Sequence, residues 1–175
     1  MADITFNTGA GKTVDREMLL ACLNTSATTT PTWSVIGKRV PDSSEEVDWS
    51  EDSSTDILGQ TYTTLSKPTI TQTFDPVPLD GGDTAAVKIW NMAIKDQDYA
   101  ALAAQDMLIV HLYAGASSAS AFAERYSACA VRPTGLGGEG GGNISMPIDV
   151  TYGGLRTLGT ATVSTAGVIT FTPDA

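Results

Sequence analysis

The stretch NISMPIDVTY, residues 143–152, carries the clearest structural signal in this chain. Its apolar side chains occupy every second position, at Ile144, Met146, Ile148, Val150 and Tyr152. Successive side chains of a β-strand point to opposite faces of a sheet. We therefore expect a strand here, with one face in a hydrophobic core and the other toward water.

Similar patterns extend outward from this segment in both directions. Further strands are predicted at residues 32–40, 57–65, 69–74, 106–113, 122–132, 155–163 and 168–172. Gly153-Gly154 and residues 164–167 read as turns between the last strands. Residues 14–23 fit either a short helix or a strand. Together these segments predict a mainly β fold, a sandwich or barrel.

One helix is predicted on the outside of this β structure, over residues 83–94. Asp83 is a suitable N-cap, because its carboxylate can accept hydrogen bonds from the free N–H groups of the first turn. Apolar residues then recur at helical spacing and form a face that we expect to pack on the sandwich, namely Ala86, Ile89, Trp90 and Ala93. Residues 96–104 predict a second, shorter helical stretch.

The length and composition limit how many domains the chain can form and which partners it can bind. A chain of 175 residues suits one domain. We expect an N-terminal arm at residues 1–31 and a single β-sandwich domain at residues 32–175. Twenty acidic and ten basic residues give a formal net charge of −10, which disfavours tight binding of DNA or an anionic membrane. The two cysteines, Cys22 and Cys129, form no CxxC motif, and neither a signal peptide nor a membrane span is predicted.

An acidic stretch lies between the predicted strands 32–40 and 57–65. Residues 41–56 contain no base but seven acids, which are Asp42, Glu45, Glu46, Asp48, Glu51, Asp52 and Asp56. A hairpin loop of this length is usually functional or disordered. A solvated loop and a cation site are alternatives, although the spacing of a calcium loop is missing. Trp49 favours a contact arm, because tryptophan is enriched as an anchor at interfaces.

Motifs for catalysis are weak in this chain. GAGKT at residues 9–13 ends like a phosphate-binding loop, but the first glycine of that motif is replaced by Phe6. His111 is the only histidine, and it lies in an apolar strand where a core or interface role is favoured. The glycine-rich residues 135–142 precede no helical pattern and read as a surface loop. We expect no enzymatic activity, no cofactor and no metal site.

Extended phrases of the sequence resemble the major tail tube proteins of phages with long, non-contractile tails. The resemblance rests on DILGQTYTTLSKPTITQTFDPVPL (residues 56–79), KIWNMAIKDQDYAAL (residues 88–102) and YSACAVRPTGLGGEGGGNISMPIDVTYGG (residues 126–154). It implies a β-sandwich flanked by a helix, which closes into hexameric rings. The rings stack into the tube through which DNA leaves the capsid. Some members carry a C-terminal immunoglobulin-like domain, which we do not expect here.

The resemblance also implies partners and a contact arm. The partners are other copies of the chain, the tape-measure protein, the terminator and distal tail proteins, and double-stranded DNA that passes without specific binding. The protein would assemble in the host cytoplasm and reside in the virion tail. By position, the arm that reaches the adjacent ring is the acidic stretch, with Asp42, Glu45, Glu46, Asp48, Trp49, Glu51 and Asp52 as contact residues. The flanking strands 32–40 and 57–65 are expected to line the lumen.

Two other functional classes remain open from the sequence, beside an enzyme that would use Gly11, Lys12 and Thr13. One is another virion connector, such as a head–tail joining protein. The other is a β-sandwich binding module unrelated to virions.

Overall fold

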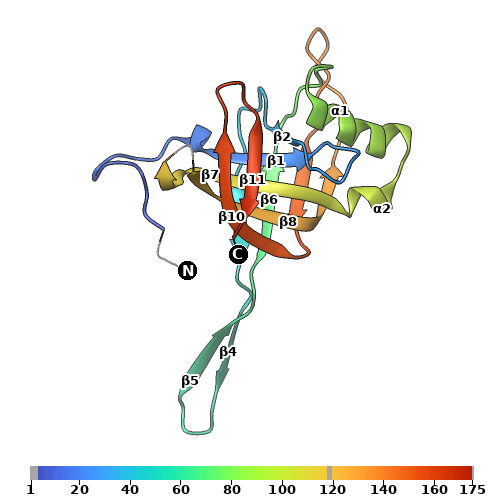
Figure 1. Ribbon diagram of the computed structural model, residues 1–175. Helices are drawn as coiled ribbons and strands as arrows, with labels where there is room; N and C mark the ends of the chain where they lie inside the picture. The colour runs from blue at the N-terminus through green and yellow to red at the C-terminus, as the bar shows by residue number, and fades with distance from the viewer. Residues whose placement is uncertain (1–3, 118–119, 175) are drawn as a thin grey trace.

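The computed structural model describes residues 4–117 and 120–174, and it confirms the mainly β fold class. Nine strands form one antiparallel sheet in which the path β2-β1-β7-β8-β9-β6-β3 is extended by β10 and β11 (Figure 1). A separate pair, β4 and β5, projects from this body as a long hairpin (Figure 1). The strands are β1 (Leu19–Asn24), β2 (Trp33–Ile36), β3 (Glu45–Asp48), β4 (Glu51–Thr55), β5 (Thr61–Leu65), β6 (Thr69–Phe74), β7 (Gln105–Ser117), β8 (Ser120–Pro133), β9 (Ile148–Tyr152), β10 (Arg156–Val163) and β11 (Ile169–Pro173).

Strand β8 joins two layers of the sheet. Its first half pairs with β10 and its second half with β9. The turn at Gly153 and Gly154 passes directly against the bend between these halves, at Ala128. A Cβ atom on Gly153 would lie 2.7 Å from the Ala128 carbonyl oxygen, and Gly154 has a φ of +74°. Glycine is therefore required in this turn, since a side chain would meet backbone.

Two hydrophobic clusters lie on opposite sides of β1 and β7. The larger contains Met146, Ile148 and Val150, so the alternation of residues 143–152 is confirmed from Met146 onward. Ile144 was expected on the same buried face but is 58% exposed. The smaller cluster contains Leu108 and Val110 and is covered by residues of β10 and β11.

The helical segment covers one edge of the sheet. It consists of α1 (Thr84–Trp90), a π-helical continuation η2 (Asn91–Lys95) and α2 (Tyr99–Leu102). Asp83 caps α1 as expected, because its Oδ1 accepts a hydrogen bond from the Ala86 N–H at 3.0 Å. Asp98 caps α2 in the same way. Ala86 and Ile89 are buried in the larger cluster, whereas Trp90 and Ala93 are only partly buried.

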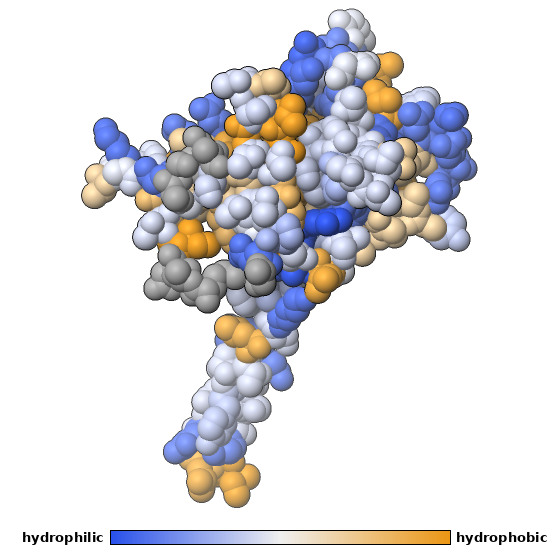
Figure 2. Space-filling view, viewed as in Figure 1, coloured by the Kyte–Doolittle hydropathy of each residue, from blue (hydrophilic) through white to orange (hydrophobic). Residues whose placement is uncertain are grey.

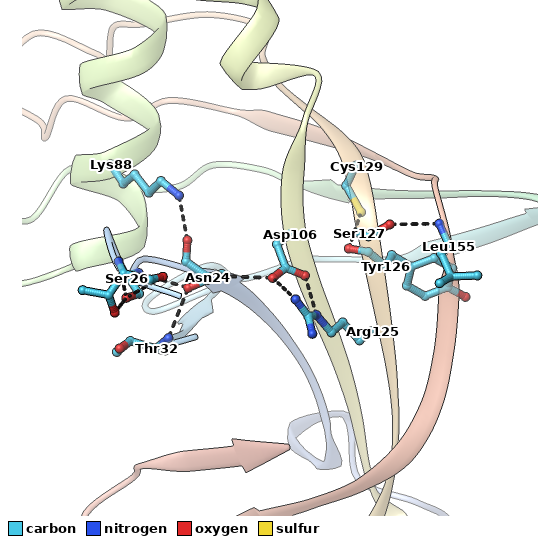
Figure 3. A network of polar contacts seen from close by, with 11 residues as sticks. Asn24, Ser26, Thr32, Lys88, Asp106, Arg125, Tyr126, Ser127, Cys129 and Leu155 are labelled. Carbon is cyan, nitrogen blue, oxygen red and sulfur yellow. Dashed lines mark hydrogen bonds and ion pairs between the residues drawn. The ribbon is translucent and has the colours of Figure 1, made fainter. Parts of the chain in front are cut away.

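A polar network ties α1 to the sheet (Figure 3). The Lys88 ammonium donates a hydrogen bond to the Asn24 carbonyl at the end of β1. The Asn24 side chain donates to Asp106, whose carboxylate also accepts two hydrogen bonds from Arg125 of β8. Paired hydrogen bonds between Arg and a carboxylate are the stronger kind of ion pair. The network therefore fixes the position of α1 relative to β1, β7 and β8.

Two sequence-based boundaries are wrong. The division at residue 31 would separate β1 from β2, yet the two strands pair along four residues and β1 lies inside the sheet. Residues 14–23, which fitted either a helix or a strand, contain a short 3₁₀ turn, η1 (Arg16–Met18), followed by the first part of β1. Residues 41–56 are not one loop, because β3 pairs with β6 in the sheet and β4 belongs to the projecting hairpin. The predicted strands 32–40 and 57–65 do not pair with each other, since β2 pairs with β1 and β5 with β4.

We expect the substitution Ile89→Ala to lower the free energy of unfolding by about 2–5 kcal/mol, because it leaves a cavity beneath α1. Ile89 is fully buried there. Ile94 of the same helical segment is 39% exposed, so Ile94→Ala is the matched control and should cost about 0.5 kcal/mol. Urea unfolding of both variants measures the difference. Equal midpoints for the two variants would contradict the packing of α1 on the core.

Candidate assembly surface

The β4–β5 hairpin is the most exposed structured part of the molecule. Residues 46–55 and 57–67 are all exposed, and Figure 1 shows the hairpin standing away from the body. Its base is closed by a hydrogen bond from the Ser66 N–H to the Trp49 carbonyl at 3.1 Å. An isolated two-stranded hairpin is marginally stable in water. A long projecting hairpin is therefore expected to gain stability when it contacts another surface.

The tip of the hairpin is organised by Asp56. Its Oδ1 accepts hydrogen bonds from the N–H groups of Leu58 and Gln60, each at 2.9 Å. Gly59 adopts a φ of +80°, which closes the turn at little steric cost. These backbone hydrogen bonds hold the pKa of Asp56 below its usual range. The turn is thus defined by local bonds before any partner binds, which reduces the ordering entropy that binding costs.

The turn that follows Asp56 exposes two large apolar side chains to solvent. Ile57 is fully exposed and Leu58 is 80% exposed. Figure 2 shows this hydrophobic surface at the far end of the hairpin. Burial of each side chain in a partner would contribute about 1.5–3 kcal/mol. The tip has the form of a small hydrophobic anchor on a largely polar stem, in which Tyr62 and Leu65 of β5 are also exposed.

The structure separates the acidic residues that the sequence grouped together. Asp42 lies opposite Asp75 in an isolated bridge, and Glu46 and Asp48 lie exposed on β3. Glu51 and Asp52 lie on β4, in the projecting hairpin. Trp49 is at the base of the hairpin, with 52% of its surface exposed. Of the predicted contact residues, only Trp49, Glu51 and Asp52 therefore belong to the hairpin or its base.

Glu45 faces the interior instead, toward a cluster of polar side chains. In the described part of the chain, its Oε2 is buried without a hydrogen-bond partner. Burial raises the pKa of Glu45, and the nearby Glu124 carboxylate raises it further, while His111 and Arg16 lower it. Glu45 was expected at the contact surface, and its inward position follows from the pairing of β3 with β6.

Glu124 of β8 is the centre of that cluster. Its Oε1 lies 3.0 Å from His111 Nε2, and its Oε2 accepts hydrogen bonds from the Tyr126 hydroxyl and the Arg156 guanidinium. Burial alone would raise the pKa of Glu124, but the hydrogen bonds from His111, Arg156 and Tyr126 lower it to about 2. His111 is thus a partly buried hydrogen-bond partner of Glu124, as a structural histidine would be. The cluster joins β7, β8 and β10.

The other candidate motifs stay separate from one another. Lys12 lies on an exposed segment that leads through the short 3₁₀ turn η1 into β1, whereas the lysine of a phosphate-binding loop opens an α-helix. Residues 135–142 form part of an exposed connection between β8 and β9, in which Gly137 and Ser145 pair in an isolated antiparallel β-bridge. Among residues 4–117 and 120–174, no three His, Cys, Asp or Glu side chains converge as a metal site would require. Over the same ranges, no helix has the length and apolar character to cross a membrane.

The fold is similar to those of proteins in solved tail-like assemblies. The chain matches a protein in the anti-feeding prophage cap, described as the tube terminating cap, with a TM-score of 0.51, 12% identity, and coverage of 89% of this chain and 96% of that one. It also matches a protein in the sheath/tube terminator of an extracellular contractile injection system in its extended state, with a TM-score of 0.51 and 9% identity. That match covers 86% of this chain and 99% of the other. No family model and no curated protein sequence matches this chain.

Sequence reasoning missed the tip residues Ile57 and Leu58. They were placed at the start of a strand, which hid their exposure at a turn. The sequence Asp56-Ile57-Leu58-Gly59 does contain a usable signal, since Asp followed by Gly three residues later is typical of a turn. Two large apolar residues inside such a turn indicate a contact site.

Proposed function

We propose that this chain is a non-enzymatic structural subunit of a phage-type tail tube, assembled as hexameric rings that stack. The observation that carries the proposal is the shared fold with proteins of tube-ending assemblies, over nearly the whole length of both chains. The resemblance of the sequence to tail tube proteins supports the same role. Its expected partners are further copies of the chain, the tape-measure protein and the proteins at the two tail ends.

The edges of the sheet support polymerisation. In the described residues, β2 pairs only with β1, and β3 only with β6, so both strands present free backbone groups. Open edges promote pairing with other chains. In a ring, the edges of neighbouring subunits can meet without leaving a free end.

The charge of the chain supports the role of a conduit. A net charge of −10 gives a surface that repels phosphate groups. DNA could then pass along the inside of the tube without being retained. This expectation concerns passage alone and requires no binding site for DNA.

A second candidate is the ring that ends a tube. The two similar assemblies with TM-scores of 0.51 are described as a terminating cap and a terminator. Such a ring would use one face for the tube and would not stack on copies of itself. It is a form of the virion connector that the sequence left open.

Negative-stain electron microscopy of the purified protein, over a range of concentrations, tests the proposal. We expect regular tubes of stacked rings at high protein concentration, because each added ring buries further hairpin and edge surface. Closed single rings at every concentration would favour the terminating ring. A monomer at every concentration, measured by sedimentation velocity, would refute both candidates.

A further inference from the structure

A small apolar cleft lies at the opposite end of the molecule from the β4–β5 hairpin. It has a volume of about 190 Å³ and is lined by Leu79, Asp80, Gly81, Val87 and Trp90. These residues belong to α1 and to the segment just before it, and Figure 1 places α1 at the end away from the hairpin. The cleft has room for one or two aliphatic side chains.

Exposed apolar surface continues beside the cleft. Val87 in its wall is 39% exposed. Ile144 is 58% exposed, and its carbonyl accepts a hydrogen bond from the Leu79 N–H at 3.0 Å. This contact places the Ile144 backbone next to Leu79 of the cleft, and Ile144 precedes β9, so it does not share the alternation of that strand. An exposed apolar patch of this kind often marks an interaction site.

The rim of the cleft carries cations that are only weakly paired. Lys38 and Arg39 lie 3.8 Å and 3.9 Å from the Asp80 carboxylate, and their side chains are 55% and 70% exposed. Surface ion pairs at such distances contribute about 0–1 kcal/mol. Both cations are therefore available to a further acidic partner.

The hairpin has the complementary chemistry. Its tip presents Ile57 and Leu58 beside Asp56, and its stem carries Glu51 and Asp52, with no basic residue between positions 40 and 66. An apolar tip would fill the cleft while the acidic stem approaches the basic rim. Complementary charge of this kind sets orientation and suppresses wrong pairings.

We propose that the cleft of Leu79, Val87 and Trp90 receives the tip of the β4–β5 hairpin from a second copy of this chain. Because tip and cleft lie at opposite ends, the contact is head-to-tail, and it generates an open stack instead of a closed pair. The proposal deepens the proposed function, on which it rests, by naming the receiving surface. It makes Leu58 the anchor, Val87 and Trp90 the cleft wall, and Lys38 and Arg39 the basic rim.

Disulfide trapping between two single-cysteine variants tests the contact. Leu58→Cys is mixed with Val87→Cys and oxidised in air with a copper–phenanthroline catalyst, and the products are separated without reductant. The native cysteines Cys22 and Cys129 are fully buried and should stay unreacted. We expect the mixed disulfide to form at least roughly tenfold faster than with a control cysteine, because the two Cβ atoms must approach within about 4 Å.

Val35→Cys is the matched control. Val35 is 37% exposed, close to the value for Val87, and it lines a larger groove along β2. A trapped pair between Leu58→Cys and Val35→Cys, or between two Leu58→Cys chains, would overturn the proposed receiving surface. The proposed receiving surface would also be overturned if the mixture of Leu58→Cys and Val87→Cys formed tubes but gave no disulfide between the two variants. In each of these cases, tubes seen by microscopy would still support the proposed function. A protein that never associates would overturn both the proposed function and the proposed contact.

Charge reversal gives an independent measurement. The double variant Lys38→Glu/Arg39→Glu should raise the protein concentration needed for tubes. Adding Glu51→Lys/Asp52→Lys to the same chain should return this concentration to that of the parent, because the charges of stem and rim again have opposite signs. Failure of the second pair to restore assembly would contradict the proposed alignment of stem and rim.

Discussion

Replacing residues 51–65 with an Asn-Gly turn should abolish tube formation while leaving a folded subunit. The replacement removes β4, β5 and the apolar tip but keeps β3, β6 and their pairing. All of the removed residues except Asp56 are exposed, so the core loses no packing. The sheet edges β2 and β3 remain, and single rings can therefore still form. Circular dichroism checks the fold, and electron microscopy counts rings and tubes.

Point variants show which part of the hairpin carries the contact. Ile57→Ser/Leu58→Ser should impair stacking most, since it removes two side chains that would each contribute about 1.5–3 kcal/mol on burial. Trp49→Ala should have a smaller effect, because Trp49 lies at the base of the hairpin. Glu51→Gln/Asp52→Asn should have the smallest effect, since exposed ion pairs contribute about 0–1 kcal/mol each. Long, regular tubes from the variant without residues 51–65 would show that another surface carries the stacking.

The second large effect concerns the stability of the body. Glu124→Gln should lower the free energy of unfolding by about 3 kcal/mol, because hydrogen bonds to a charged group contribute about 1.5–3 kcal/mol each and Glu124 accepts several. Asp149→Asn is the control. It removes the carboxylate of the exposed pair with Arg132, and it should cost at most about 1 kcal/mol. Similar urea midpoints for the two variants would contradict the central role of Glu124.

The same cluster predicts how stability depends on pH. The pKa of Glu124 is lowered in the folded state, so its contribution is present above the usual value of 4.5 and is lost as the pH falls toward 2. The pKa of Glu45 is raised, so its contribution has the opposite sign and is lost as the pH rises through that raised value. Stability should therefore be highest in the mildly acidic range. Glu124→Gln should remove most of the acid-side loss, and Glu45→Gln the loss on the alkaline side.

The local sequence pattern predicted many of the elements, although residues 14–23 stayed ambiguous and residues 41–56, which hold β3 and β4, were expected to be a loop. The alternation at residues 143–152 predicted a strand with a buried face, which the structure has as β9 (Ile148–Tyr152), and Asp83 predicted the start of α1. Both signals depend on residues within a few positions of one another. The turn glycines at positions 153 and 154 followed from the same kind of evidence. Fold class is largely the sum of such local signals, and it could be predicted.

Only the tertiary structure decided which strands pair and what each side chain faces. Residues 45–48 and 51–55 are both acidic and extended, yet β3 pairs with β6 while β4 pairs with β5. Glu45 consequently faces His111 and Glu124, and Ile57 and Leu58 stand at an exposed turn. Arg156 reaches Glu124 across 32 positions of the chain. Pairing of this kind depends on contacts between distant residues, which periodicity within one segment does not record, and it alone places the hairpin tip and the α1 cleft at opposite ends of the molecule.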